Sequence, residues 1–273
     1  MIAPDVAAFD RLLAMAAGWL RVITVAPELP GATDLITSAA QAGVIAAVGH
    51  TDATADVTAA AVDAGASHAT HLFNGMRPLH HREPGPVGAL LDRDEVSCEV
   101  IADGVHLHDT AIRLVARAAG PARLVLITDA MAAAGMPDGR YQLGSMRVDV
   151  AGGVARLAAD AGPDGEARSG AEAGSGADAR SGGEAGPRVP GAIAGSTATM
   201  ASVVRRAVAV GLPVIDVAAA ASTNPARVLG MAGRTGALCP DLDADLVVCD
   251  EAFGLRAVMR RGEWVTRSRG PNR

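Results

Sequence analysis

The sequence contains no lysine, so all 24 of its basic residues are arginine. This absence excludes a Schiff-base lysine, the lysine of a Walker A loop and a carbamylated lysine that bridges two metal ions. Aromatic residues are also scarce, at 2%, whereas 49% of the residues are hydrophobic. We therefore expect a core of alanine, valine, leucine and isoleucine, in a chain of 273 residues that can form one large α/β domain with an appendage.

The sequence also has little net charge and few cysteines. A net charge of −6 provides no basic surface, so we expect neither nucleic acid nor membrane lipid as a partner. We find no signal peptide and no apolar run close to 18 residues, which predicts a soluble, cytoplasmic protein. The cysteines Cys98, Cys239 and Cys249 are scattered through apolar runs. We expect them to be buried, free thiols in a reducing compartment.

The stretch Val44–Met76 has the pattern strand, helix, strand, with His50 just after the first strand and His71 at the end of the second. Parallel strands joined by a crossover helix end at the same edge of a sheet. Two imidazoles at that edge can share a metal ion, although the spacing alone fits two ordinary loop histidines equally well. Glu28 follows the short strand Val22–Ala26 and is either another ligand or a carboxylate at the start of a helix. We favour the helix-start role.

An irregular loop rich in proline and glycine, Arg77–Gly88, follows the second of these strands. Such a loop at a strand end is a suitable place for an arginine that binds an anion, and the candidates are Arg77 and Arg82. We expect the neighbouring His80 and His81 to face solvent.

Two later strands also end in residues that can carry chemistry. His106 and His108 follow the strand Val96–Ala102; we expect His106 to contact substrate and His108 to begin the next helix. Asp129 directly follows a strand of apolar residues, where a buried carboxylate without a role is costly. A helix cap is the alternative, but the segment after it is loop-like, so we expect Asp129 to be catalytic.

The remainder of the chain is less regular. Arg140–Val150 and Val154–Leu157 alternate like the strands of a hairpin that turns at two glycines. Residues 158–190 form a low-complexity segment that we expect to be a disordered insertion. Ser196 or Thr197 is expected to cap a helix that runs to about Val210. We expect two short strands in the tail, outside the alternating strand–helix pattern.

Six motifs occur in one order along the chain: VGHTDAT, ATHLFNGM, REPG, ADGVH, ITDA and AGS. With these motifs the sequence resembles the N-acetylglucosamine-6-phosphate deacetylases of the amidohydrolase superfamily. The segments TNPARVLG and GALCPDLDADLVVCD resemble the usual carboxyl-terminal part of that superfamily. The resemblance covers nearly the whole chain outside the low-complexity insertion.

The resemblance implies a TIM-like (β/α) barrel of the metal-dependent hydrolase type beside a small β-sandwich. We expect the barrel domain at residues 1–233 and the sandwich part at 234–273. A divalent metal is implied at His50 and His71, with zinc as the preferred ion and iron or another divalent ion as the alternative. Asp129 is implied as general base and then general acid in the hydrolysis of N-acetylglucosamine 6-phosphate to glucosamine 6-phosphate and acetate.

The resemblance also implies the residues that recognise the sugar phosphate, and a homodimer as the assembly. These residues match family positions at two strand ends and in two loops: Asn74, Gly75, Arg82, His106, Ile193, Ala194 and Gly195. Among them Arg82 suits a phosphate because its guanidinium offers paired donors.

The sequence departs from the family pattern at its amino end. Family members have a first sandwich half, a first barrel strand with His-x-His and a segment His-x-Glu-Gly-Pro that supplies a glutamate ligand, and none of these segments is found in this sequence. We therefore expect a chain shortened at its amino end, with a barrel that lacks its first strands and a sandwich remnant. One alternative is a truncated, non-catalytic member that binds a phosphosugar or a partner. Another is a different metal-dependent amidohydrolase.

Overall fold

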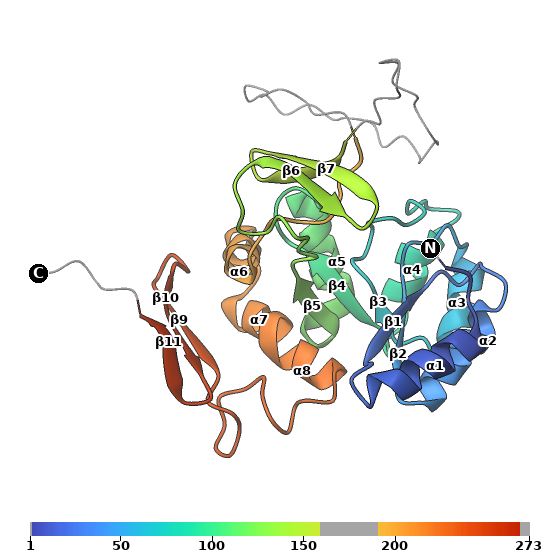
Figure 1. Ribbon diagram of the computed structural model, residues 1–273, viewed down its shortest axis with the longest axis horizontal. Helices are drawn as coiled ribbons and strands as arrows, with labels where there is room; N and C mark the ends of the chain where they lie inside the picture. The colour runs from blue at the N-terminus through green and yellow to red at the C-terminus, as the bar shows by residue number, and fades with distance from the viewer. Residues whose placement is uncertain (1, 159–190, 268–273) are drawn as a thin grey trace, which may run out of the picture. The chain divides into compact units, whose positions relative to one another are not determined.

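The protein is described by a computed structural model that covers residues 2–158 and 191–267 (Figure 1). Almost all of the insertion expected at 158–190 therefore lies outside the described residues. The chain divides into two compact units, one formed by residues 1–128 and 200–273, and a smaller one formed by Asp129–Thr199. The domain boundary expected after residue 233 stays a prediction.

A parallel sheet of five strands lies at the centre of the larger unit. The strands follow one another in chain order, and a helix separates each strand from the next. They are β1 (Val22–Val25), β2 (Ile45–Val48), β3 (His68–Ala69), β4 (Ser97–Ile101) and β5 (Leu124–Ile127). Parallel strands in sequential order with helical connections are the building pattern of a (β/α) barrel, so the α/β class expected from the sequence is confirmed.

Helices connect the strands of this sheet and continue after it. They are α1 (Val6–Ala16), α2 (Ala32–Gln41), α3 (Ala55–Asp63), α4 (Gly85–Leu91), α5 (Asp109–Arg123), α6 (Met200–Ala209), α7 (Val214–Ala218), the π-helical turn η1 (Ala219–Thr223) and α8 (Asn224–Val228). Short polar side chains begin two of them, since Asp5 accepts from the first main-chain N–H groups of α1 and Thr54 does so for α3. His108 caps α5 by accepting from the N–H of Thr110 at 3.1 Å, which confirms its expected place at a helix start.

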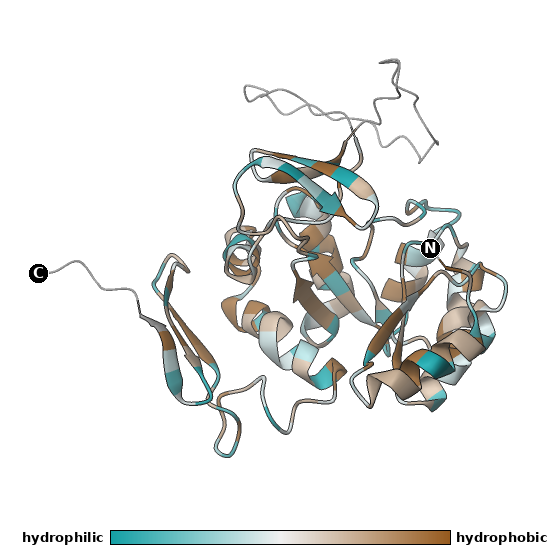
Figure 2. Cartoon of the chain, viewed as in Figure 1, coloured by the Kyte–Doolittle hydropathy of each residue, from teal (hydrophilic) through white to brown (hydrophobic). Residues whose placement is uncertain are grey.

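Small aliphatic side chains fill the core, as the composition predicts. The strands of the parallel sheet are mainly hydrophobic in Figure 2, and most of their buried positions carry alanine, valine, leucine or isoleucine. Phe9 is the one aromatic side chain that is buried among the described residues. Cys98 lies in this core, and burial raises the pKa of its thiol to about 11. Cys239 and Cys249 are exposed, so the expectation of three buried thiols is wrong for these two.

The smaller unit contains an antiparallel sheet of β6 (Gly139–Leu143), β7 (Met146–Ala151) and β8 (Val154–Leu157). The β7–β8 turn at Gly152 and Gly153 was expected, and both glycines have positive φ. The sequence did not reveal the earlier turn at Gly144, where φ is +60°, which divides the predicted first strand into two. Aliphatic side chains of this sheet, including Val148, Val150 and Ala155, pack with Met131 in a small core.

A second antiparallel sheet, of β9 (Leu246–Cys249), β10 (Leu255–Arg260) and β11 (Glu263–Arg267), forms the tail. Two strands were expected; the third arises because the last apolar run folds back at Arg261 and Gly262. No side chain of this sheet that the structure describes is buried. Among the described residues, no helix has the length and apolarity needed to cross a membrane.

Two helix boundaries differ from the sequence-based expectation. Helix α4 begins at Gly85, inside the segment interpreted as an irregular loop, and Pro86 in its first turn suits a helix start. Helix α6 begins at Met200 rather than directly after Ser196. The Ser196 hydroxyl instead accepts from the N–H of Ala198 at 2.9 Å, so it stabilises a turn before the helix.

Candidate functional site

His50 and His71 meet at the edge of the parallel sheet where strands β2 and β3 end. Their Nε2 atoms lie 2.8 Å apart, and the rings stand edge to face at an interplanar angle of 85°. Both residues have positive φ, +50° for His50 and +28° for His71, which turns each side chain out of the strand direction. The expectation that adjacent strand ends bring these imidazoles together is confirmed; their role as metal ligands stays a prediction.

The segment after β3 runs parallel to the segment after β2 and pairs with it through a β-bridge between Met76 and Thr51. The N–H of Thr51 donates to the carbonyl of Gly75 at 2.9 Å, and the N–H of Arg77 donates to the carbonyl of Thr51 at 3.0 Å. A Cβ atom on Gly75 would lie 3.0 Å from Nδ1 of His50, and the φ of Gly75 is +60°. Glycine therefore allows the main chain to approach the imidazole closely. Asn74 lies in the same turn and donates from Nδ2 to the carbonyls of His71 and Leu72.

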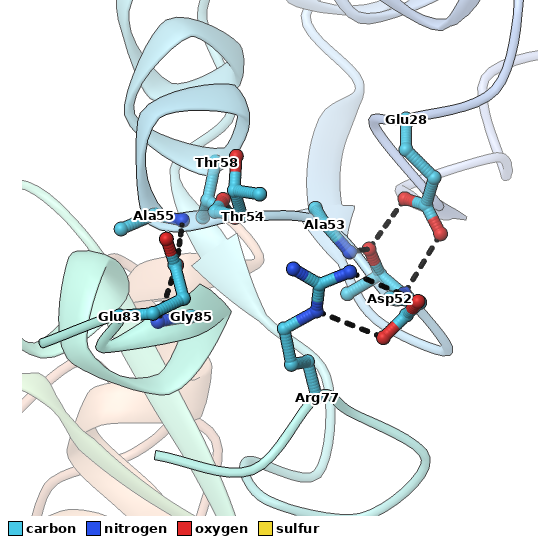
Figure 3. Close-up of polar contacts among 10 residues, drawn as sticks. Glu28, Asp52, Ala53, Thr54, Ala55, Thr58, Arg77, Glu83 and Gly85 are labelled. Atoms are coloured by element: carbon cyan, nitrogen blue, oxygen red, sulfur yellow. Dashed lines mark hydrogen bonds and ion pairs between the residues drawn. The ribbon is translucent and has the colours of Figure 1, made fainter. Parts of the chain in front are cut away.

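Glu28 binds the His50 loop rather than the start of α2. One of its carboxylate oxygens accepts from the Thr51 hydroxyl at 2.5 Å, and the other accepts from the N–H of Asp52 at 2.8 Å. Figure 3 shows this contact next to the paired hydrogen bonds between Arg77 and Asp52, at 2.9 and 3.0 Å. The helix-start role that we favoured for Glu28 is therefore wrong, and both its oxygens are engaged in fixing this loop.

The two candidate anion-binding arginines differ in their surroundings. Arg77 is paired with Asp52, and the hydrogen bond from Arg77 lowers the pKa of that carboxyl group. Arg82 is exposed, with its guanidinium 2.8 Å from Nε2 of His81. Next to it, Glu83 accepts from the N–H groups of Ala55 and Gly85, at 2.8 and 3.1 Å, which fixes the loop to the start of α3 (Figure 3). His80 and His81 are exposed, as expected.

His106 is held by a carboxylate that the sequence reading did not single out. Nδ1 of His106 lies 2.7 Å from Oδ2 of Asp103, and the two side chains are 5% and 7% exposed. Burial alone would raise the pKa of Asp103, but hydrogen bonds from the His106 ring and from the N–H groups of His106 and Val105 outweigh it and lower this pKa to about 2. An ionised Asp103 requires a proton on Nδ1, which leaves Nε2 of a neutral His106 as the acceptor.

Asp129 and the loop at residues 193–195 lie together in the smaller unit. The carbonyl of Asp129 accepts from the N–H of Ser196 at 2.8 Å, and a Cβ on Gly195 would lie 3.2 Å from that carbonyl. Ala194 is buried and Ile193 is half-buried. Asp129 itself is exposed and has a φ of +49°. The premise that its carboxylate is buried is therefore wrong, because the chain turns outward directly after the apolar strand; its catalytic role stays a prediction.

The sequence matches the Amidohydrolase family over residues 6–265. The chain belongs to the amidohydrolase family. Similar proteins include the N-acetylgalactosamine-6-phosphate deacetylase of Escherichia coli O157:H7, at 38% identity over 95% of this chain, and the N-acetylglucosamine-6-phosphate deacetylase of Lysinibacillus sphaericus, at 34% over 96%. The chain spans 60% of the length of each of these relatives.

Solved structures of deacetylases are also similar to this chain. The N-acetyl-D-glucosamine-6-phosphate deacetylase of Mycobacterium smegmatis is 44% identical, with a TM-score of 0.80 over 97% of this chain and 63% of that one. A variant of that enzyme, in complex with N-acetyl-D-glucosamine-6-phosphate, has 45% identity and the same TM-score. The amidohydrolase fold expected from the sequence motifs is thereby confirmed.

Membership of this family implies a divalent metal ion, and the histidine pair fits one by its donor chemistry. Two Nε2 atoms converge at a strand edge, and imidazole nitrogen is a common ligand of zinc and related metals. Catalytic zinc sites usually have three protein ligands, however, and the part of the chain that the structure describes contains no group of three histidine, cysteine, aspartate or glutamate residues arranged to hold a metal ion. The pair therefore supplies an incomplete ligand set.

Proposed function

We propose that this protein is a metal-dependent amide hydrolase that removes acetate from N-acetyl-D-glucosamine 6-phosphate and releases D-glucosamine 6-phosphate. The observation that carries the proposal is the convergence of His50 and His71 at the carboxyl edge of the parallel sheet, in a chain of the amidohydrolase family. The names of the similar proteins support the substrate class, since they are deacetylases of N-acetylated amino-sugar 6-phosphates.

We assign the metal to His50 and His71, with zinc as the preferred ion and iron or another divalent ion as the alternative. When bound, such an ion polarises a carbonyl and lowers the pKa of water. Asp129 takes the proton of the attacking water and passes it to the leaving amine, so the amine departs in a neutral form. Its exposure gives the carboxylate access to solvent and substrate.

Recognition of the phosphosugar is assigned to the loops that follow the strands. Arg82 is exposed, and no carboxylate among the described residues forms an ion pair with it, so its guanidinium is available to a phosphate. His106 presents Nε2 to a sugar hydroxyl because Asp103 holds Nδ1. The remaining contacts come from Asn74 and Gly75, and from the main chain of the loop Ile193, Ala194 and Gly195.

A second candidate substrate is N-acetylgalactosamine 6-phosphate. The relative with 38% identity carries that name, and the two sugars differ only in the configuration of one hydroxyl group. The two substrates therefore share the acetamide and the phosphate, and the choice between them depends on hydrogen bonds to a single hydroxyl. A homodimer and a cytoplasmic location belong to the same proposal.

The deciding experiment measures metal content and acetate release from both sugar phosphates by the 273-residue chain. We expect bound divalent metal, turnover of N-acetylglucosamine 6-phosphate, and a lower kcat/KM for the galactosamine epimer. Asp129→Asn should lower kcat by at least about 100-fold while metal content stays close to that of the parent chain. Metal and turnover lost together in Asp129→Asn would contradict its role as the base. Absence of both in the parent chain would favour a non-catalytic member that binds a phosphosugar or a partner.

A further inference from the structure

Glu99 is a charged residue in the middle of the apolar strand β4. Its neighbours Val100 and Ile101 are fully buried, and its own side chain is 19% exposed. A carboxylate in such surroundings is costly unless hydrogen bonds satisfy its oxygens. The proposed chemistry does not use Glu99, so its position calls for a different explanation.

Both carboxylate oxygens of Glu99 contact strand β3 or the residues that follow it. Oε1 accepts from Nε2 of His68 at 2.9 Å, and Oε2 accepts from the main-chain N–H of His71 at 3.1 Å. The carbonyl of Glu99 also accepts from the N–H of Leu72 at 2.9 Å. One residue of β4 therefore holds two successive residues of the chain at the end of β3.

His71 needs this support because its main chain leaves the regular strand. Strand β3 ends at Ala69, and φ is +28° at His71 and +75° at Phe73. Positive φ at residues other than glycine is unfavourable and persists only where surrounding contacts enforce it. The contacts here are Glu99 on the N–H of His71 and Asn74 on its carbonyl.

The ring of His71 has less support than its main chain. Its Nδ1 is buried and has no hydrogen-bond partner among the described residues. Metal-binding histidines usually donate this second nitrogen to a carboxylate or carbonyl, which orients the ring. The direction of the His71 ring therefore depends on where its main chain is fixed, and on the contact with His50.

We propose that Glu99, whose carboxylate is held by a hydrogen bond from His68, is a positioning residue for His71. Glu99 does not touch a metal or substrate; it fixes the main chain of His71 so that Nε2 points at Nε2 of His50. His68 is 2% exposed and holds the other carboxylate oxygen, which keeps Glu99 in the orientation that reaches His71. This inference rests on the proposed role of the histidine pair in metal binding.

The test compares Glu99→Ala with the parent chain in two measurements, both made well below the unfolding temperature. In the metal-free protein, ¹⁵N shifts of the His50 and His71 ring nitrogens report whether the Nε2 atoms still meet. Titration with Co²⁺ reports affinity, which we expect to fall by about 10- to 100-fold, the usual effect of losing a residue that orients a ligand. Glu99→Gln keeps an oxygen for the N–H of His71, so it should restore most of the affinity and the ring shifts.

Glu83→Ala is the matched control. Glu83 also accepts two main-chain N–H groups, from Ala55 and Gly85, but it contacts neither histidine of the pair. It should leave the ring shifts and Co²⁺ affinity within about 3-fold of the parent. Equal losses in both alanine variants, or a lower unfolding temperature in Glu99→Ala with unchanged ring shifts, would overturn the proposal and leave Glu99 a purely structural residue.

Two other results of this test also have a defined meaning: a Glu99→Ala variant that does not fold, and a parent chain that binds no Co²⁺. If Glu99→Ala does not fold, His68→Leu, which removes the donor to Glu99, replaces it, and unchanged His71 ring shifts in that variant would overturn the proposal. If the parent chain binds no Co²⁺, the metal assignment in the proposed function fails. The ring shifts of the metal-free variants still show whether Glu99 positions His71, so the two failures remain distinguishable.

Discussion

Single carboxylates fix the histidines of this protein through hydrogen bonds to main-chain N–H groups. Glu28 binds the loop that carries His50, Glu99 binds the N–H of His71, and Asp103 binds both the N–H and the ring of His106. A carboxylate that accepts several N–H groups is stabilised in its charged form and is rigidly placed. Each of these side chains is therefore worth testing apart from the histidine that it holds.

Asp103→Asn should lower the free energy of unfolding by about 2 kcal/mol at pH 7, because the pKa of Asp103 lies near 2 in the folded chain and near 3.8 as a free side chain. A lowered pKa contributes stability that is fully present above about pH 5 and is lost as the pH falls toward 2. The difference between parent and variant should therefore stay constant from pH 5 to 7 and shrink from pH 4 to 3.

Urea unfolding at each pH measures this difference. The exposed Asp10→Asn variant is a suitable comparison for the loss of one negative charge. If the difference in unfolding free energy between parent and variant did not change between pH 5 and 3, the folded structure would not lower the pKa of Asp103.

Arg82→Ala should reduce kcat/KM for the phosphorylated sugar by about 10- to 100-fold, because a charge-assisted hydrogen bond contributes roughly 1.5–3 kcal/mol. Unphosphorylated N-acetylglucosamine should be affected far less. Steady-state kinetics with both sugars measure the effect, and Arg234→Ala, which removes an arginine paired with Asp243, controls for lost positive charge. Equal losses for the two sugars would show that Arg82 does not bind phosphate.

At the scale of elements, the short helix α8 is attached to the sheet through Asn224. This side chain is buried, and its Nδ2 donates to the carbonyls of Pro121 and Leu124, both at 2.7 Å. These carbonyls belong to the point where α5 ends and β5 begins, a kink marked by the positive φ of Gly120. Asn224 therefore joins two elements that are about a hundred residues apart in the sequence.

Asn224→Ala should lower the free energy of unfolding by about 2–3 kcal/mol, because it leaves two carbonyl groups without their donor. Denaturant unfolding followed by circular dichroism measures the change. The nearby exposed Ser222→Ala should stay within about 0.5 kcal/mol of the parent chain. A loss below 1 kcal/mol in Asn224→Ala would indicate that water replaces the amide at both carbonyls.

At the scale of the whole molecule, the parallel sheet contains side chains buried from solvent, whereas the described side chains of the carboxyl-terminal sheet are not buried. Leu124 and Leu126 of β5 are at most 2% exposed, whereas Val247 of β9 and Val265 of β11 are 61% and 64% exposed. Apolar side chains that stay in contact with water contribute little to folding. The stability of the chain should therefore depend on the parallel sheet.

Val247→Thr and Val265→Thr should each change the free energy of unfolding by less than about 0.5 kcal/mol, since both positions are open to solvent and threonine suits a strand. The buried Ile112→Val should cost about 0.5–1.5 kcal/mol, although it removes only one methylene group. Calorimetry on the three variants compares them directly. A larger loss for the two threonine variants would show that another surface covers these valines in solution.

The sequence by itself determined the parallel α/β framework and the meeting of His50 with His71. These depend on hydrophobic periodicity and on the rule that adjacent parallel strands end at one edge, both of which are visible in a linear pattern. Only the tertiary structure decided the partners of Glu28, Glu99 and Asn224, which lie 23 to 103 residues away in the chain. Their effects depend on side chains from separate elements approaching within 3.1 Å, and residue spacing does not encode such an approach.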